Sequence, residues 1–192
     1  MKERGILFSA PMVRALLAGT KTQTRRAMRV QQTLGRPEYP GRRDKSGFST
    51  VHWLDTPEGI AGAIAACPYG QPGSKLWIRE THMDLGACFL YRANDGAEAE
   101  RSLVAPGQRW RPSIHMPRIA SRITLELTGV RVERLQDISE ADALAEGVRS
   151  KHTADCHYSA RESYSVLWET INGPGSWDAN PWVWVLTFRR VA

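Results

Sequence analysis

Apolar residues alternate along residues 123–132, and the alternation changes parity part-way. Odd-numbered apolar positions starting at Ile123 give way, after Gly129, to the even-numbered Val130 and Val132. Such a shift is expected where a β-bulge adds one residue to a strand, because side chains in a strand alternate strictly between two faces. The segment therefore predicts one long, bent strand.

The remaining periodic segments are short and mix two types. Period-two patterns predict strands near residues 6–8, 73–81, 89–92 and 180–190, and helical spacing predicts three helices, starting at Ser9, Ser139 and Ser159. Gly19 and Gly147 are expected to end the first two helices. Because strands and helices do not alternate regularly, we expect an α+β fold, a small mixed β-barrel with helices at its ends, over a doubly wound parallel sheet.

Length and composition fit one globular domain. The chain has 192 residues, of which 42% are hydrophobic and 24% charged, so we expect a single domain over residues 1–192. Stretches rich in Gly, Pro and charge predict inserted loops at about residues 31–74 and 84–120. Motifs for nucleotide cofactors and for standard serine hydrolases are missing, so we expect no cofactor.

Positive charge is concentrated in two stretches of this chain. The formal net charge is +6, and residues 1–43 hold ten Lys or Arg against Glu3 and Glu38; residues 101–122 hold five Arg and no acidic residue. Two basic strips can converge on a phosphate or a polyanion, or can form a solvated surface. RNA is therefore a candidate partner.

Cysteines and apolar runs limit the other function classes. Cys67, Cys88 and Cys156 are an odd number without CxxC spacing, and His152 and His157 beside Cys156 lack a second ligand cluster, so we expect no disulfide framework and no metal. The hydrophobic run near the N-terminus is too short for a signal peptide, and no apolar window approaches about 20 residues. We expect a cytoplasmic protein without membrane contact, of unspecified oligomeric state.

Lys21 stands out because the chain has 21 arginines and five lysines. Lysine can release its proton when it is buried or crowded by cations, whereas arginine stays charged. Arg25, Arg26 and Arg29 would lower the pKa of Lys21, and a helical turn would put Thr24 on the same face. Lys21 and Thr24 could then act as base and nucleophile; the alternative is a surface turn that binds anions.

Four stretches of the chain resemble one family. "GTKTQTRR" at 19–26 resembles the GxKxxxxR signature of ASCH domains, and "PGSKLWIRE", "ISEADALAEGV" and "NPWVWVLTF" resemble other parts of longer, often phage or prophage encoded members. ASCH domains belong to the PUA-like barrels, so the resemblance implies that fold. The loops at 31–70 and 84–118 have no counterpart in it.

Thr24 in the signature makes the chain more similar to one subgroup of the family. Many ASCH proteins have glutamate at the position of Thr24, whereas the threonine version is similar to small bacterial N4-acetylcytidine amidohydrolases, with a Lys, Thr and Glu as catalytic group. The resemblance assigns these roles to Lys21, Thr24 and Glu146. It implies hydrolysis of an N4-acylated cytidine or a related modified pyrimidine nucleoside.

Physical reasoning is compatible with this set but leaves alternatives. Glu146 precedes Gly147 at a helix C-terminus, where the helix dipole disfavours a carboxylate; it could also be an ordinary exposed glutamate. Glu80 lies on an apolar strand face and needs Lys21 or an arginine as partner, either in the site or in a structural ion pair. Together with Arg26 and Ser9, Glu80 is a candidate for substrate binding.

Two further functions remain alternatives to the amidohydrolase. A nearby carboxylate would keep Lys21 charged, in which case Lys21 would stabilise an oxyanion while a glutamate acts as base. A PUA-like module could instead bind RNA without catalysis, with Trp110 and Tyr91 near the basic strips. Some ASCH proteins are described as nucleases, so a ribonuclease with Lys21 and Arg26 on a phosphate is the intermediate hypothesis.

Overall fold

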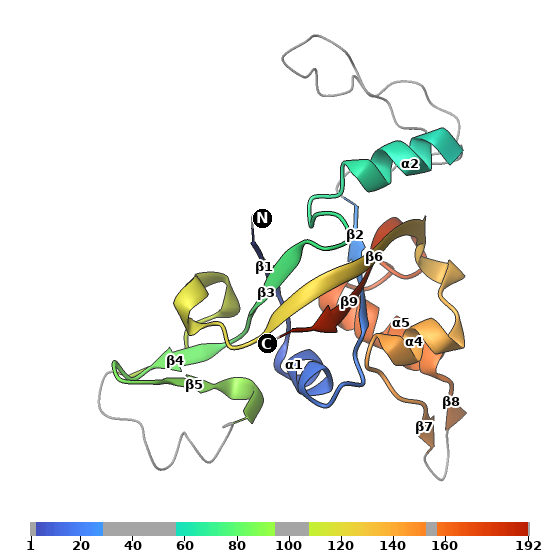
Figure 1. The fold of residues 1–192 in the computed structure, drawn as a ribbon. Helices are drawn as coiled ribbons and strands as arrows, with labels where there is room; N and C mark the ends of the chain where they lie inside the picture. The colour runs from blue at the N-terminus through green and yellow to red at the C-terminus, as the bar shows by residue number, and fades with distance from the viewer. Residues whose placement is uncertain (1–2, 29–56, 95–107, 153–156, 192) are drawn as a thin grey trace.

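A computed structural model describes residues 3–28, 57–94, 108–152 and 157–191 (Figure 1). Its elements, in chain order, are β1 Arg4–Leu7, α1 Ala10–Leu17, β2 Gln23–Ala27, α2 Pro57–Ala65, β3 Lys75–Arg79, β4 His82–Asp84, β5 Phe89–Tyr91, η1 Ser113–His115, η2 Arg118–Ala120, β6 Thr124–Arg134, η3 Leu135–Asp137, α4 Glu140–Ala145, β7 Lys151–His152, β8 His157–Tyr158, α5 Ala160–Asn172 and β9 Trp182–Arg190. The fold is of the α+β class, as predicted.

The main sheet has five strands in the order β1-β3-β6-β9-β2. β1 runs parallel to β3, and the other neighbouring strands are antiparallel. Within the described ranges no pairing joins the two edge strands β1 and β2, so the sheet is not closed into a barrel there. Two small hairpins, β4–β5 and β7–β8, stand apart from this sheet (Figure 1).

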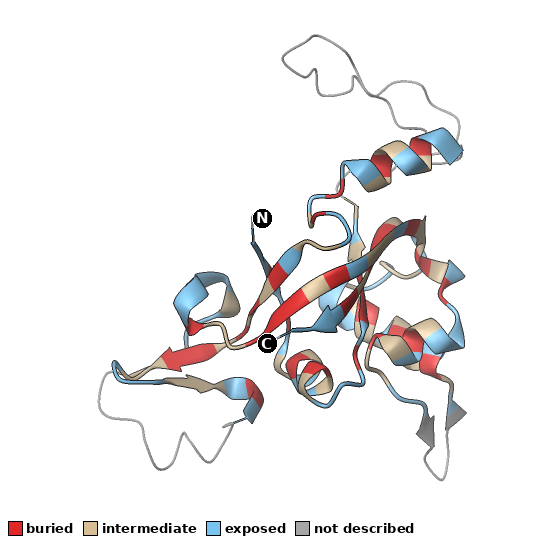
Figure 2. Cartoon of the chain, in the orientation of Figure 1, coloured by how far each residue is buried: buried red, intermediate tan, exposed pale blue. Residues whose placement is uncertain are grey.

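The sheet separates two hydrophobic cores. The first core contains Leu186 and Phe188 of β9 with Val13 of α1, and the second contains Val185 of β9 with Trp168 of α5. Neighbouring residues of β9 therefore enter different cores, which is the alternation expected of a strand covered on both faces. Figure 2 shows buried positions along β3 and β6 in the middle of the sheet.

The bent strand is confirmed. β6 pairs with β9 along its whole length, and the register shifts between Leu127 and Gly129. The shift places Leu127 opposite Phe188 and Val130 opposite Leu186, so apolar side chains on both sides of the bulge face the first core. This bulge explains the parity change in the sequence.

The three expected helices are present, with one difference in capping. The Ser139 side chain accepts a hydrogen bond from the Asp142 N–H, and Ser159 forms a reciprocal capping box with Glu162. Ser9 occupies the N-cap position of α1, but its side chain makes no capping hydrogen bond. Gly19 and Gly147 follow α1 and α4 with φ of 72° and 86°, the left-handed conformation that favours glycine.

The insertions contain more regular structure than expected. The prediction of irregular chain over 31–74 is wrong for α2, whose sequence PEGIAGAIA has two glycines that blur its helical pattern. In the second insertion β5 was expected, and the structure adds β4, η1 and η2. Residues 31–56 and 95–107 lie outside the described ranges. None of the described helices is long and apolar enough to cross a membrane.

Candidate active site

Lys21 lies where the turn after α1 meets the end of α4. The backbone N–H groups of Thr20 and Lys21 both donate to the Ala15 carbonyl, which closes the end of α1. Lys21 then forms an isolated antiparallel bridge with Glu146, and the Thr22 N–H donates to the Ala145 carbonyl at 2.9 Å. Two segments that are 125 positions apart are thereby held side by side.

The Lys21 ammonium group has three acceptors. Nζ donates to Glu146 Oε2 at 2.7 Å, to the Glu146 carbonyl at 2.8 Å and to the Gln23 carbonyl at 2.8 Å. Only 1% of the Lys21 side chain and 4% of the Glu146 side chain are exposed. Three acceptors require three N–H donors, so these contacts correspond to the charged ammonium rather than the neutral amine. The prediction that a carboxylate lies beside Lys21 is confirmed.

Opposing influences act on the pKa of Lys21. Burial lowers this pKa because the charged form loses its hydration, and the charge and hydrogen bond of Glu146 act in the opposite direction. Arg26 and Arg25 lower it further, and the net direction is downward. Lys21 therefore holds its proton less tightly than a solvent-exposed lysine, while Glu146 provides an acceptor at hydrogen-bond distance.

Gly147 makes the close approach of Lys21 and Glu146 sterically feasible. A Cβ at Gly147 would lie 2.8 Å from the Ala15 Cβ and 3.0 Å from the Lys21 Cβ. The first distance is shorter than real Cβ contacts, the second is tighter than most of them, and φ is also positive at this position. Glu146 itself is 3% exposed, so the alternative of an exposed glutamate at the end of a helix is wrong.

Arg25 is a member of the cluster that sequence reasoning did not place. Its Nη1 lies 3.3 Å from Glu146 Oε1, and its guanidinium also pairs with Glu133 and with Asp142. Each oxygen of the Glu146 carboxylate thus has a cation beside it, Lys21 on one and Arg25 on the other. The signal was the QTRRA segment itself: in a strand, residue 25 points to the face opposite to residues 24 and 26.

Thr24 does not lie one helical turn from Lys21, because residues 23–27 form the strand β2. Thr24 is 4% exposed and stands opposite Leu186, whose side chain belongs to the first core. No hydrogen bond joins its hydroxyl to Lys21 in the described part of the chain. The structure thus brings Thr24 into the same buried segment as Lys21, with both side chains inaccessible to bulk solvent.

Arg26 shares an aromatic neighbour with Lys21. Its guanidinium lies 5.0 Å from the centre of the Phe8 ring, and Lys21 Nζ lies 5.5 Å from the same ring. Arg26 Nη2 donates to the Leu7 carbonyl. Among the described residues its Nε is a buried atom without a hydrogen-bond partner. A buried donor without a partner is costly in a protein interior.

The two other candidate residues are placed differently. Glu80 is 2% exposed, and both of its oxygens accept from Arg122 at 2.9 and 3.1 Å, so its partner is an arginine and not Lys21. Arg122 also stacks on Tyr91, 4.0 Å from the ring centre. Ser9 is exposed and directly follows Phe8 at the start of α1. Glu80 thus has the geometry of a structural ion pair, whereas Ser9 only adjoins Phe8, the ring that Lys21 and Arg26 approach.

Metal-ligating side chains do not gather in the described ranges: no group of three or more His, Cys, Asp or Glu could hold an ion there. Of the sequence cluster, Cys156 lies outside those ranges, as do the side chains of His152 and His157. Cys67 and Cys88 are free thiols.

No family model, curated protein or solved structure matches this chain.

Proposed function

We propose that this protein is an ASCH-type amidohydrolase with a PUA-like fold that removes the acyl group from N4-acylated cytidine or a related nucleoside. The observation that carries the proposal is the buried Lys21 ammonium, 2.7 Å from Glu146 Oε2, with the equally buried Thr24 three residues further along the chain. A buried amine with a lowered pKa and a carboxylate acceptor can shuttle protons, which a nucleophilic hydroxyl needs. Free thiols at Cys67 and Cys88 fit a cytoplasmic setting.

The first step is a proton transfer from Lys21 Nζ to Glu146 Oε2. Of the three acceptors around Nζ only this carboxylate can take up a proton, since the other two are amide carbonyls. Neutral Lys21 then accepts the hydroxyl proton of Thr24 while Thr24 Oγ1 attacks the acyl carbon. Either role for Lys21, base or oxyanion donor, requires that one of its present hydrogen bonds is exchanged when substrate binds.

The remaining steps return every group to its starting state. The bond between the acyl carbon and N4 breaks as N4 takes the proton from Lys21, and cytidine leaves with an acyl ester on Thr24. Water then attacks the ester, its proton passes through Lys21 to Thr24 Oγ1, and Glu146 returns its proton to Lys21. We assign the unpartnered Nε of Arg26 to the carbonyl oxygen, where negative charge develops in both attacks.

The charges around Lys21 favour a neutral substrate over a phosphate. Lys21 and Arg25 are accompanied by the carboxylates of Glu146, Glu133 and Asp142, so the cations already have anionic partners. A phosphodiester would have to displace these carboxylates at a buried position, which costs several kcal/mol per unpaired charge. The ribonuclease alternative is therefore less well supported than hydrolysis of an amide.

The test uses chromatography to measure the release of cytidine from N4-acetylcytidine by the purified protein. Thr24→Val removes the hydroxyl at constant shape, and Thr24→Ser retains it. Thr187→Val on the neighbouring strand β9 is the matched control, because it makes the same change at a half-buried position opposite Gln23. We expect turnover by wild type, Thr24→Ser and Thr187→Val but not by Thr24→Val. Full activity in Thr24→Val would refute the assigned nucleophile.

A further inference from the structure

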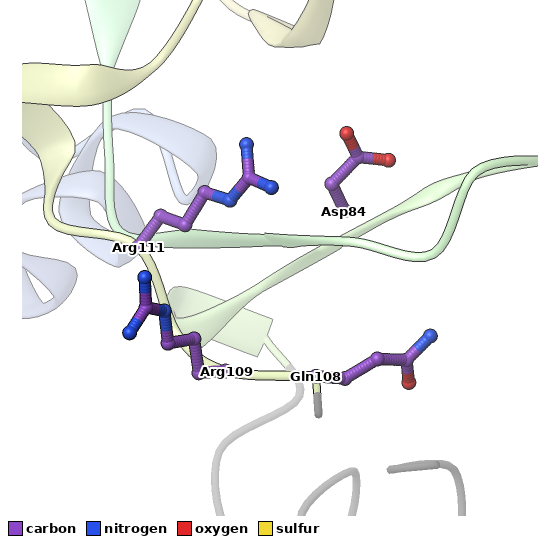
Figure 3. A pocket seen from close by; sticks show the side chains of 4 residues that line it. All are labelled: Asp84, Gln108, Arg109 and Arg111. Carbon is purple, nitrogen blue, oxygen red and sulfur yellow. The ribbon is translucent and has the colours of Figure 1, made fainter. Parts of the chain in front are cut away.

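A second polar site lies on the β4–β5 side of the molecule. A cavity of about 290 Å³ is lined by Asp84, Gln108, Arg109 and Arg111, whose side chains are shown in Figure 3. This volume is just below the range for small-ligand sites, roughly 300–1,000 Å³, and suits one phosphate with its sugar rather than a larger molecule. All four residues belong to stretches outside the ASCH resemblance and outside the cluster around Lys21.

The backbone of this site is fixed on two sides. The Arg111 N–H donates to the His82 carbonyl at 2.7 Å, and the His82 N–H donates to the Arg111 carbonyl at 3.2 Å. Arg111 is therefore joined to β4, which ends at Asp84. Arg109 and Arg111 are two positions apart in this extended segment, and both side chains are exposed.

The two arginines are not neutralised. Neither Arg109 nor Arg111 forms an ion pair with a carboxylate in the parts of the chain that the structure describes. Asp84 stands on β4 on the other side of the cavity from Arg111 (Figure 3), and one of its oxygens accepts from the Gly86 N–H at 2.9 Å. The other carboxylate oxygen accepts no hydrogen bond from the residues that the structure describes, so a ligand can donate to it.

Two cations and one free acceptor specify a ligand that is both anionic and a hydrogen-bond donor. Guanidinium groups bind phosphate through paired N–H donors, but a bare phosphate would be repelled by Asp84. A ribose 2′-hydroxyl can donate to a carboxylate, and DNA lacks this hydroxyl. We propose that this cavity binds the RNA backbone, with the phosphate on Arg109 and Arg111 and a neighbouring 2′-hydroxyl on Asp84.

The test measures binding of a short labelled single-stranded RNA and of the DNA of the same sequence to the full chain by fluorescence anisotropy. We expect RNA to bind more tightly than DNA. The double variant R109Q/R111Q should weaken RNA binding by about tenfold or more, since it removes both guanidinium groups that donate to the phosphate. The salt dependence of log Kd should also decrease, by about one unit of slope for each phosphate that the variant no longer binds.

Two further variants make the outcome specific to the cavity. Arg190→Gln removes one exposed positive charge at the end of β9 and should leave the affinity nearly unchanged. Asp84→Asn should tighten DNA binding, because it removes the repulsion between the Asp84 carboxylate and the phosphate. It should also reduce the preference for RNA, because the 2′-hydroxyl loses its charged acceptor. Equal binding of RNA and DNA by wild type, or equal effects of R109Q/R111Q and Arg190→Gln, would overturn the proposal. Thermal melting verifies that all variants are folded, and none of them touches the Lys21 cluster.

Discussion

The Lys21 Nζ lies 2.7 Å from Glu146 Oε2, and both side chains are almost completely buried. Ion pairs of this kind are poor sources of net stability, because two charges have to be dehydrated. Arg25 adds a second cation to the same carboxylate. A pair with this cost is expected where a chain needs a proton donor and acceptor in a dry environment.

Breaking the pair from either side should destabilise the fold. We expect Glu146→Gln to lower the free energy of unfolding by about 3–5 kcal/mol, because it leaves the buried Lys21 ammonium without a carboxylate. Lys21→Met should cost less, because Arg25 still pairs with Glu146. The double variant should lose less unfolding free energy than the two single variants together, since both charges of the pair are then removed. Urea unfolding measures all three; losses below about 0.5 kcal/mol in the single variants would show that the residues are solvated in solution.

Gly147→Ala should disturb the site as well as the turn. The added Cβ would meet the Cβ atoms of Ala15 and Lys21, and neither can move without its backbone. Gly173→Ala is the control, because Gly173 also has a positive φ but no atom within 4 Å of the added Cβ. We expect Gly147→Ala to cost clearly more than the roughly 1 kcal/mol of backbone strain in Gly173→Ala. Equal losses in thermal or urea unfolding would mean that the close approach is unimportant.

Part of this site could be anticipated from the sequence. The bulge at Gly129 and the helix caps at Ser139 and Ser159 could be predicted, because each depends only on residues that are close together in the sequence. The contact between Lys21 and Glu146 came only through the resemblance, since no spacing rule joins positions so far apart.

The strand β2 was missed for a physical reason. QTRRA has no apolar alternation, because its polar side chains are buried by partners contributed from α4 and β6 rather than by hydrophobic packing. The sequence predicts that Glu80 needs a cationic partner but does not identify Arg122 as that partner, and no local pattern shows that Arg25 pairs with Glu146. Both depend on which distant charges the fold brings together.

His82 should make stability depend on pH. Its ring is fully buried, Nε2 has no partner among the described residues, and burial lowers its pKa from the usual 6.5. Arg111 lowers it further, while the Glu80 carbonyl and the charges of Asp84 and Glu80 oppose this. The unfolded chain thus takes up the proton first, and the free energy of unfolding should fall as pH drops through 6.5 towards the folded pKa.

His82→Phe should remove this dependence, because the ring is replaced by an apolar one of similar shape. The difference between variant and wild type in free energy of unfolding should grow as the pH is lowered. His115→Gln on η1 serves as the control, since that side chain is exposed. A difference between His82→Phe and wild type that stays constant with pH would contradict a neutral buried ring.

Arg122 should stabilise the fold by compensating the buried negative charge of Glu80. Arg122→Met leaves the Glu80 carboxylate with no guanidinium, and we expect a loss of about 3 kcal/mol, the low end for buried pairs because Arg122 is partly exposed. Turnover per folded molecule should be unchanged, since this pair does not contact Lys21. A specific loss of turnover at full stability would restore Glu80 as a substrate-binding residue.

The most direct test of the central claim compares wild type with the double variant K21M/E146Q in hydrolysis of N4-acetylcytidine. The variant keeps a hydrogen-bond acceptor for Arg25 and loses the pair that can exchange a proton. Our account predicts cytidine release by wild type and, in folded double variant, a rate equal to that in buffer. A wild type no faster than buffer, or a double variant as fast as wild type, would contradict it.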